Sequence, residues 1–558
     1  MSRSTPAFSE SKPLEARKNA TSTAIGRLLG LPAKRNKVRV ERAVNVPMRD
    51  GVTLLADHYI PVTHEPAPTI LIRCPYGRGF PYDLMTGLPF AERGYHVLLQ
   101  STRGTFGSGG THRPGADEPN DAQDTVAWLR TQDWFDGRLA TAGGSYLGFT
   151  QWALAMDPPP ELTAMVVMIG VHDLGLAGYS QGPLDLFNIL SWCDLLSHQE
   201  QVGPMRGLLR MVRAERRLAP VLNRMPLRGA MDDTSGKATP WFDEWVDHTD
   251  PNDPYWEPYR MADALQRSTV PTLLIGGWHD FFLTQTLQQY ASLRSRNVDV
   301  DVALTIGPWT HLNVDNKIAM PQAIAWLDAH TAGRAPVRRD APVRVFVGGA
   351  KQWQDHQSWP PDDGRRTTWY LQKDGRLADS PPTAASSTTG FRYDPKNPTP
   401  SVGGRLMALS GGAQDNRKLE ARDDVLVFTT DPLTAPFEFH GAPVVELHIT
   451  SDNADADLFA RICDVDPVGR SVNVTDRIVR CTAQDTAPGH VRTVRITIDP
   501  AAHRFLAGHR VRLQVSGGAF PRFARNLGSG EAPGTGTKTR TTTHLIHHDT
   551  AHLSALTL

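Results

Sequence analysis

The sequence has few cysteines and no excess of either charge. Among its 558 residues, lysine plus arginine and aspartate plus glutamate both number 59, so the formal net charge is zero. No dense basic stripe is present that would follow a phosphate backbone, and we expect no nucleic-acid partner. The four cysteines, Cys74, Cys193, Cys463 and Cys481, lie far apart and match neither a disulfide framework nor a paired metal-ligand motif. We therefore expect reduced, structural thiols.

Long apolar segments are also missing. The longest unbroken run, AMVVMIGV at 164–171, is far shorter than the roughly 20 residues that a membrane helix needs. The N-terminal residues contain no signal-peptide core, because Arg27 interrupts their only apolar patch. We expect a cytoplasmic protein with no membrane partner. The first 37 residues are polar and aperiodic, which predicts a flexible segment.

A chain of this length is too long for one hydrophobic core, and its patterns change along the sequence. Residues 38–60 alternate apolar positions on either side of Arg49-Asp50-Gly51, which predicts a β-hairpin. Short apolar runs then alternate with helical stretches such as 121–132. These runs are typical of buried parallel strands in an α/β fold: 69–73, 96–100, 139–143, 165–170, 272–277 and 303–307.

About a hundred residues separate the fourth of these runs from the fifth, and they contain amphipathic segments that predict an inserted helical cap. After about residue 335 the pattern becomes short strands punctuated by Gly, Pro and Asp, which predicts a separate all-β domain, a sandwich or jelly roll. The predicted segments are a flexible N-terminus, two parts of an α/β-hydrolase domain flanking the cap, and a C-terminal jelly roll: 1–37, 38–171, 172–266 (cap), 267–335 and 336–558.

Ser145, in the stretch TAGGSYLG, stands between a predicted strand and a predicted helix. This is the position of a nucleophile elbow, where the turn exposes the hydroxyl and directs the next amide, that of Tyr146, at an oxyanion. The motif departs from G-x-S-x-G, since Leu147 takes the second position after the serine and Gly148 follows it. By itself the pattern fits a helix N-cap equally well.

The candidate partners follow two later strands. Asp280 ends TLLIGGWHD and His311 ends ALTIGPWTH, so the chain order is Ser, Asp, His, as in α/β-hydrolases. Asp173 also follows a strand and is the alternative acid. His279 competes weakly with His311, because as the neighbour of Asp280 in an extended chain it would point the other way.

The loop RCPYGRG at 73–79 follows an early strand, where α/β-hydrolases place their second oxyanion donor. No HGGG motif is present, and the phenol of Tyr76 is the candidate donor, with simple packing as the alternative. Phe282, two residues after Asp280, is the candidate for substrate contact.

The sequence from about residue 40 to the C-terminus resembles the cocaine-esterase-like branch of the X-Pro dipeptidyl peptidase family. The matching segments are MRDGVTL, RCPYGRG, STRGTFGSGG, DAQDTVAWLRTQDWFDGRLATAGGSYLG, GGWHDFF, IGPWTH, PVRVFVGGAKQW and AFPRFARN. The resemblance implies Ser145 as nucleophile, Asp280 and His311 as its partners, Tyr76 and the Tyr146 amide as the oxyanion hole, and a helical cap with a C-terminal jelly roll. One departure is Ser101, where relatives usually carry an acidic residue.

These observations predict a serine hydrolase that cleaves a small-molecule carboxylic ester or amide through an acyl-enzyme. The alternative, an X-Pro dipeptidyl peptidase, needs carboxylates for the substrate ammonium, and Asp185 and Asp194 in the cap are the candidates. A catalytically silent binding protein is disfavoured because every catalytic position is filled. We expect no cofactor and no metal, because no ligand-type residues show zinc or calcium spacing. The motifs leave the acyl group, the leaving group and the oligomeric state open.

Overall fold

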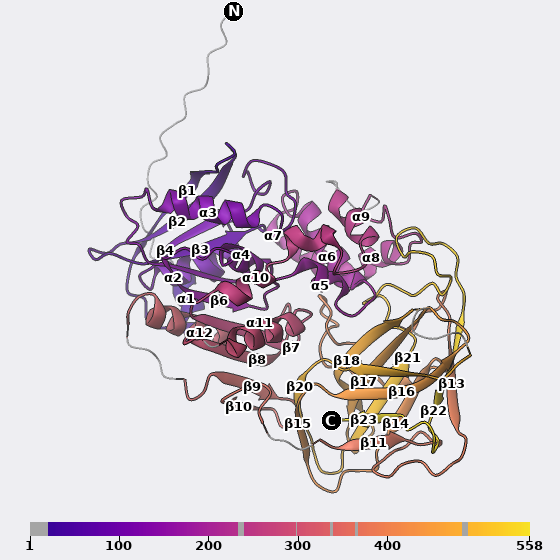
Figure 1. Cartoon of the computed structure of the whole chain (residues 1–558). Coiled ribbons are helices and arrows are strands. Elements are labelled where there is room, and N and C mark those ends of the chain that lie inside the picture. The colour runs from indigo at the N-terminus through magenta and orange to yellow at the C-terminus, as the bar shows by residue number, and fades with distance from the viewer. Residues whose placement is uncertain (1–19, 233–238, 297, 335–338, 363–365, 483–488) are drawn as a thin grey trace, which may run out of the picture. The chain divides into compact units, whose positions relative to one another are not determined.

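The computed structural model describes residues 20–232, 239–296, 298–334, 339–362, 366–482 and 489–558 (Figure 1). By its internal contacts the chain divides into two compact units. Each unit combines segments that are distant in sequence: Met1–Val166 with Asn316–Val337, and Val167–Asp315 with Arg338–Leu558.

The first unit combines a mixed sheet with helices. Its strands follow the order β1-β2-β4-β3-β5-β6, and the chain passes to the second unit near the end of β6. β1 and β2 form the predicted antiparallel hairpin, whereas β3 runs parallel to both β4 and β5, as the apolar runs predicted. The elements are α1 (Ala20–Leu28), β1 (Val38–Pro47), β2 (Thr53–Pro61), β3 (Thr69–Cys74), η1 (Asp83–Gly87), α2 (Leu88–Ala91), β4 (His96–Ser101), α3 (Glu118–Leu129), β5 (Leu139–Gly144), α4 (Tyr146–Leu154), β6 (Leu162–Met168) and α12 (Asn316–His330).

The N-terminal segment differs from the expectation of a flexible stretch over 1–37. Residues 1–19 lie outside the described residues, but helix α1 follows them, and its Ser22 is buried and donates a hydrogen bond to Glu92. Lys34 pairs with the same carboxylate at 2.6 Å. These polar side chains order the segment by binding a buried acid, an interaction that an apolar-periodicity analysis does not detect.

The second unit contains the helices between β6 and β7 and a second group of strands. β7 and β8 are parallel, β9 is parallel to β8, and β10 is antiparallel to β9. The elements are α5 (Leu174–Tyr179), α6 (Leu186–His198), α7 (Pro204–Val212), α8 (Ala214–Leu222), α9 (Pro240–Asp247), η2 (Pro254–Tyr259), α10 (Ala262–Arg267), β7 (Thr272–His279), α11 (Leu283–Ser295), β8 (Val302–Thr310), β9 (Val343–Val347) and β10 (Gln352–His356).

Strand β9 corrects one part of the sequence prediction. The sequence pattern places PVRVFVGG in the C-terminal β domain, yet β9 extends the parallel pair β7 and β8. Its burial alternates along five residues, and such a pattern identifies a half-buried strand without identifying its neighbour. The predicted boundary near residue 336 marks a change in sequence pattern. It does not mark a change of sheet, because β9 follows the boundary and still pairs with β8.

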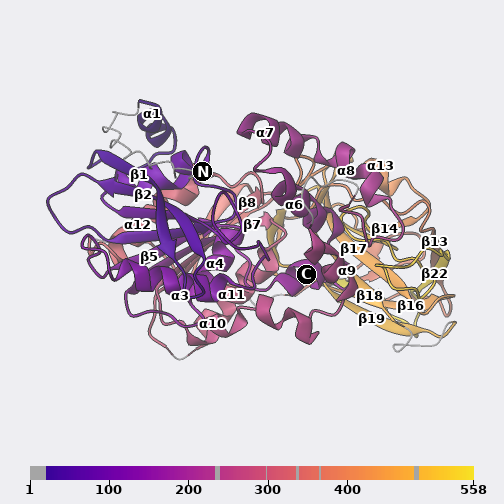
Figure 2. The ribbon, with the colours of Figure 1, turned by 90° about the horizontal axis from the view of Figure 1, so that it is seen from above.

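The remaining strands form an all-β part, as predicted. A seven-stranded sheet has the order β12-β11-β23-β16-β22-β13 with β19 paired to β16, a four-stranded sheet the order β14-β21-β17-β18, and β15 pairs with β20. Buried residues of β16 and β17, one from each larger sheet, share one hydrophobic core, so the two sheets pack face to face (Figure 1 and Figure 2). The elements are β11 (Thr368–Leu371), β12 (Leu377–Ala378), β13 (Thr388–Tyr393), α13 (Arg417–Glu420), β14 (Val425–Thr429), β15 (Phe437–Gly441), β16 (Val444–Ser451), β17 (Ala456–Val465), β18 (Ser471–Cys481), β19 (Arg492–Thr497), β20 (Ala501–Phe505), β21 (Arg510–Ser516), β22 (Thr542–His547) and β23 (Ala555–Thr557).

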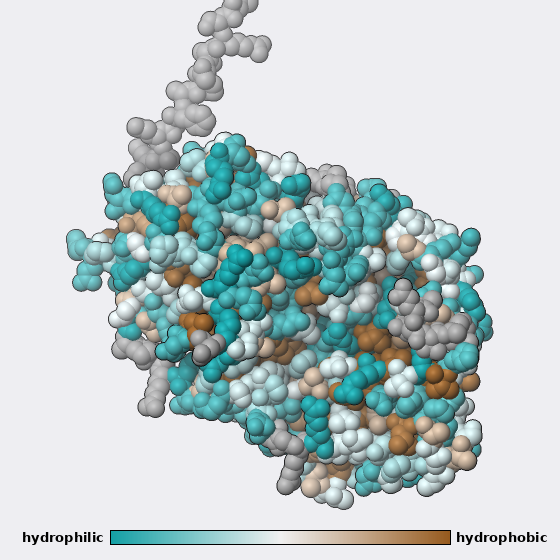
Figure 3. Space-filling view, in the orientation of Figure 1, coloured by the Kyte–Doolittle hydropathy of each residue, from teal (hydrophilic) through white to brown (hydrophobic). Residues whose placement is uncertain are grey.

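The surface agrees with the balanced composition. On the face shown in Figure 3, hydrophilic side chains cover most of the area and hydrophobic ones form small separate groups. Within the described ranges, no helix combines the length and the apolar character that a membrane crossing requires. All four cysteines are buried, and burial raises the pKa of the Cys74 and Cys463 thiols to about 12, which suits structural thiols.

Candidate active site

Ser145 lies between β5 and α4, as the sequence predicted. Its backbone has φ 60° and ψ −127°, a left-handed conformation that is strained for any residue other than glycine. An N-cap residue normally has an extended backbone and accepts a hydrogen bond from the helix, but the Ser145 side chain makes no capping bond. The ordinary N-cap interpretation is therefore not supported, whereas a sharp strand-to-helix turn is what a nucleophile elbow requires.

The glycine two positions before the serine has a steric role. A Cβ on Gly143 would lie 2.5 Å from the Cβ of Leu147 in the first turn of α4, so any larger residue would push the helix away from the strand end. All nine residues of α4 are buried. The turn is consequently held between a strand and a helix that have little freedom to move.

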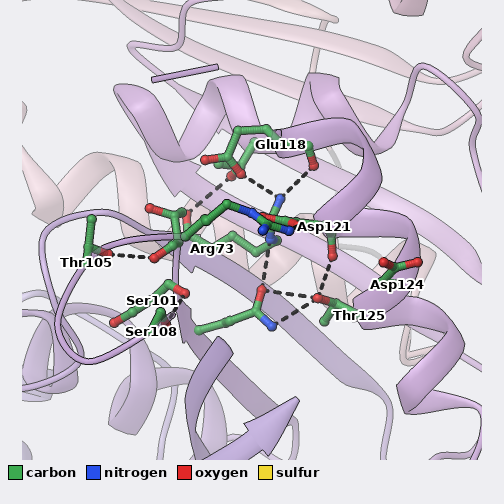
Figure 4. Close-up of polar contacts among 12 residues, drawn as sticks. Arg73, Ser101, Thr105, Ser108, Glu118, Asp121, Asp124 and Thr125 are labelled. Carbon is green, nitrogen blue, oxygen red and sulfur yellow. Dashed lines mark hydrogen bonds and ion pairs between the residues drawn. The ribbon is translucent and has the colours of Figure 1, made fainter. Parts of the chain in front are cut away.

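The side chain of Tyr146 points into a buried polar network. Its hydroxyl accepts a hydrogen bond from the Gly115 amide at 2.8 Å and donates one to Glu118 Oε1 at 2.9 Å. Glu118 is also paired with Arg73, Nη1 to Oε2 at 2.7 Å (Figure 4). Burial raises the pKa of Tyr146 well above its ordinary value and also raises that of Glu118. The Tyr146 hydroxyl is therefore engaged by Gly115 and Glu118, and the backbone amide is the group of Tyr146 that is suited to bind an oxyanion.

The same network continues across neighbouring elements (Figure 4). Arg73 on β3 donates through Nε to Gln100 Oε1 on β4 at 2.9 Å, and the Gln100 amide donates to Thr125 on α3 at 2.9 Å. Asp121 pairs with Arg103 at 2.5 Å. Sequence analysis missed this network, although an arginine at the end of the apolar run TILIR was a signal that a buried strand carries a charge in need of partners.

Tyr76 lies in the loop after β3, where its ring stacks on Tyr82 with centroids 5.9 Å apart. Arg78 in the same loop donates to Ser101 Oγ at 2.5 Å and to Asp57 Oδ1 at 3.2 Å. Ser101 is neutral, so Asp57 on β2 supplies the negative charge for Arg78. The loop that carries Tyr76 therefore keeps a charged anchor despite the departure at 101.

Asp280 and His311 come together at the ends of two neighbouring parallel strands. Asp280 follows β7, His311 follows β8, and His311 Nδ1 lies 2.7 Å from Asp280 Oδ1. The register shifts between Gly277 and His279, and a Cβ on Gly277 would lie 2.3 Å from the Trp309 carbonyl oxygen. Only glycine lets the two strand ends approach this closely.

Burial and packing fix the geometry of this pair. Asp280 is fully buried, and its Oδ2 has no hydrogen-bond partner among the residues that the structure describes. The rings of Phe281 and Phe282 lie 4.4 and 5.4 Å from that of His311, the second in an edge-on arrangement. Phe282, the candidate for substrate contact, thus packs against the imidazole. A buried carboxylate with one satisfied oxygen is stabilised by a positive imidazolium beside it.

The two competing residues occupy other positions. Asp173 caps helix α5, accepting from the Leu176 amide at 2.9 Å, and pairs with Arg260 at 3.0 Å. Burial, more than any neighbouring charge, lowers the pKa of His279 to about 4, and Arg405 lowers it further. Of the two candidate acids, Asp280 is the one that contacts His311.

The α/β sheet, the strained turn at Ser145 and the aspartate–histidine pair at parallel strand ends are each features expected of an α/β serine hydrolase. Two family models match: X-Pro dipeptidyl-peptidase (S15 family) over 50–313, and X-Pro dipeptidyl-peptidase C-terminal non-catalytic domain over 336–557. Cocaine esterase from Rhodococcus sp. (strain MB1 Bresler) is 32% identical over 541 residues, covering 87% of this chain and 92% of that protein. The chain belongs to the X-Pro dipeptidyl-peptidase (S15) family.

Two solved structures share the fold over nearly the whole chain. An aminopeptidase from a Thaumarchaeota archaeon has a TM-score of 0.79 at 24% identity, with 93% of this chain and 96% of that one covered. An α-amino acid ester hydrolase has a TM-score of 0.78 at 22% identity, with 94% and 98% covered. These likenesses extend through both the α/β part and the all-β part.

Proposed function

We propose that Ser145, Asp280 and His311 form a catalytic triad that hydrolyses a small-molecule carboxylic ester or amide through an acyl-enzyme. The observation that carries the proposal is the 2.7 Å contact between His311 and the buried Asp280 at adjacent strand ends. The positive φ of Ser145, with no capping bond from its side chain, supports it independently.

In the proposed cycle the Ser145 hydroxyl attacks the substrate carbonyl while His311 Nε2 accepts its proton. The Asp280 carboxylate accepts a hydrogen bond from Nδ1–H of the imidazole, which fixes the tautomer and stabilises the imidazolium as it forms. His311 then protonates the leaving group, and water, activated by the same imidazole, releases the acid from Ser145. His311 passes the serine proton to the leaving group and later passes the proton of the attacking water to Ser145 Oγ, so no net charge accumulates on the enzyme.

The oxyanion is proposed to be bound by the Tyr146 amide and the Tyr76 hydroxyl. The network of Glu118 and Arg73 holds the Tyr146 ring, and so the first residue of α4, in place. The Arg78 anchor holds the loop of Tyr76. Donors that are fixed before the reaction stabilise a developing charge without reorganising, which makes such groups effective in catalysis.

The two carboxylates suggested for binding the terminal ammonium of a peptide are poorly suited to that role. This favours a small-molecule ester or amide substrate over an X-Pro peptide. Asp194 on α6 is paired with both Arg210 and Arg217, so its charge is already neutralised. Asp185 is buried, and burial raises its pKa to about 7, which disfavours a stable anion for a substrate ammonium. A peptide with a free N-terminus would need a partner other than these two residues.

We also propose that the helices between β6 and β7, residues 172–266, act as a cap over the substrate, and that the all-β part is a jelly roll. The position of these helices in the chain supports the cap. They follow the strand that leads to Ser145 and come before β7, the strand that leads to Asp280. The two face-to-face sheets support the jelly roll. Exchange of residues 172–266 for those of a relative should change substrate preference and leave fluorophosphonate labelling intact, and an unchanged preference would count against the cap.

The decisive experiment is active-site labelling. A fluorophosphonate probe should label the folded protein, and Ser145→Ala should abolish labelling without lowering the thermal midpoint. A panel of aryl esters, acyl-amino-acid esters and Gly-Pro anilides then separates the substrate classes. Turnover of the anilides above all esters would replace our proposal with the dipeptidyl-peptidase alternative, and no labelling of the folded wild type would favour a binding protein.

A further inference from the structure

Three potential metal ligands converge at the edge of the all-β part, far in sequence from the proposed triad. His547 ends strand β22, and Asp549 and His552 lie in the turn that leads to β23. One ligand atom from each residue can be chosen so that all three atoms lie within 4.8 Å of one another. The segment HHDTAH at 547–552 has the spacing His-x-Asp-x-x-His. This spacing is not one of the usual zinc or calcium motifs, so the sequence alone predicts no metal here.

The backbone holds this turn firmly. Asp549 and His552 form an isolated antiparallel bridge, and the Asp549 carboxylate accepts from the amides of Ala551 and His552, both at 3.0 Å. Ser554 donates to the His547 carbonyl at 2.6 Å and accepts from the His448 amide at 2.9 Å. The turn is thereby tied to β16 and β22, so the ligands need little reordering to bind an ion.

The orientation of the imidazoles also suits ligation. His552 Nδ1 lies 3.0 Å from Asp549 Oδ1, and His547 Nε2 lies 2.6 Å from Thr450. The two rings lie 5.1 Å apart, so that a nitrogen of each and a carboxylate oxygen of Asp549 can surround one ion. A hydrogen bond that fixes one imidazole nitrogen orients the other toward a metal, as the contact with Thr450 does for His547. An ion shared by His552 and Asp549 would take the place of their Nδ1–Oδ1 hydrogen bond.

A third imidazole borders the group. His448 on β16 is the cross-strand partner of His547, and its ring lies 5.6 Å from that of His552. Its Nδ1 lies 3.1 Å from Thr493 and its Nε2 lies 3.8 Å from Glu446, so in this geometry it is a neighbour and not a ligand. The carboxylate of Glu446 adds negative charge near the site.

We propose that His547, Asp549 and His552 bind one divalent transition-metal ion. Two imidazoles and a carboxylate suit Zn²⁺ or a similar ion, whereas Ca²⁺ and Mg²⁺ prefer oxygen ligands. The ion links the end of β22 to the turn before β23, so it stabilises the C-terminal strand of the seven-stranded sheet. The site is independent of the proposed triad, and its presence or absence does not alter the hydrolase assignment.

Calorimetric titration with Zn²⁺ tests the proposal on the full-length protein. Wild type should bind one ion, and His552→Gln and His547→Asn should each weaken binding more than tenfold, since even loss of a residue that only orients a ligand costs about 10- to 100-fold. Binding should weaken as pH falls from 7 to 5.5, because the imidazoles must be deprotonated to ligate. His64→Gln is the matched control, because His64 is an exposed histidine outside the cluster and its replacement should leave binding unchanged.

Thermal unfolding gives a second readout. Zn²⁺ at about 100 times its dissociation constant should raise the midpoint of wild type by several degrees and that of His552→Gln by far less. The His552 side chain is 32% exposed, so its replacement should fold, which far-UV circular dichroism and fluorophosphonate labelling verify. No saturable binding up to about 1 mM Zn²⁺, or equal affinity in wild type and both folded variants, would overturn the proposal.

Discussion

Tyr76→Phe and Tyr146→Phe remove the same hydroxyl from two tyrosines to which we assign different roles. The Tyr76 phenol is proposed to donate to the oxyanion, whereas the Tyr146 phenol is bound to Gly115 and Glu118 below the elbow and only the backbone amide of Tyr146 is proposed to act. One chemical change therefore tests a side-chain donor and a backbone donor in the same enzyme.

For Tyr76→Phe we expect a loss of turnover. Removing one oxyanion donor lowers kcat by about 100- to 1000-fold, or roughly 3–4 kcal/mol of transition-state stabilisation, with little change in KM. The ring is kept, so its stacking on Tyr82 at 5.9 Å persists and the thermal midpoint should stay near that of wild type.

For Tyr146→Phe we expect the reverse. The Gly115 amide loses its acceptor and Glu118 loses one donor inside a buried network, and an unsatisfied buried group costs roughly 1–3 kcal/mol. The thermal midpoint should fall by roughly 2–10 °C for a unit of this size. The backbone amide remains, so kcat should stay within a few fold of wild type.

Both variants are assayed with one aryl ester, measuring kcat, KM and the thermal midpoint. Near-normal turnover of a folded Tyr76→Phe enzyme would remove Tyr76 from the site. A large loss of kcat in Tyr146→Phe with an unchanged midpoint would refute the division of roles, because it would give the phenol a chemical part that the network does not explain.

Three further predictions concern charge. Asp280→Asn should lower kcat about ten-thousand-fold by stabilising the wrong imidazole tautomer, whereas Asp173→Asn should lower stability and leave kcat within a few fold; equal kcat losses would reopen the choice of acid. A histidine general base predicts that kcat/KM rises between pH 5 and 8, and a flat profile with chemistry limiting would exclude a histidine base. Burial lowers the pKa of His58 to about 3 and that of His96 to about 4, so the unfolded chain binds more protons below pH 6.5 and the free energy of unfolding should fall as pH drops from 6.5 to 4; His58→Phe should flatten that fall in chemical denaturation.

Periodicity predicted the strands that position the site. The runs at 69–73, 139–143 and 272–277 became β3, β5 and β7, because continuous apolar residues of strand length are needed where both faces of a sheet are covered. The chain order of Ser145, Asp280 and His311 was also readable, since parallel strands carry their site residues at their carboxyl ends. The triad itself stays a prediction.

The periodicity of the sequence did not predict which strands and which polar side chains pair with one another. Strand β9 joined β8 because a short alternating strand can pair with any sheet that has an open edge. Helix α1 and the Glu118 network depend on polar groups that find one another in three dimensions, such as Arg73 with Glu118 across 45 residues. A single sequence shows which residues are charged, but it does not show which of them pair in the folded protein.

The charge partner of Arg78 has a consequence for recombination between relatives. Asp57 on β2 already accepts Arg42 at 2.5 Å as well as Arg78, while Ser101 contributes only a hydroxyl. An aspartate imported at 101 would place a second carboxylate next to the first around a shared guanidinium. A chimera that keeps Asp57 and gains an acid at 101 would crowd two carboxylates around Arg78. One that keeps Ser101 but loses Asp57 would remove the carboxylate of the Arg78 ion pair and loosen the loop of Tyr76.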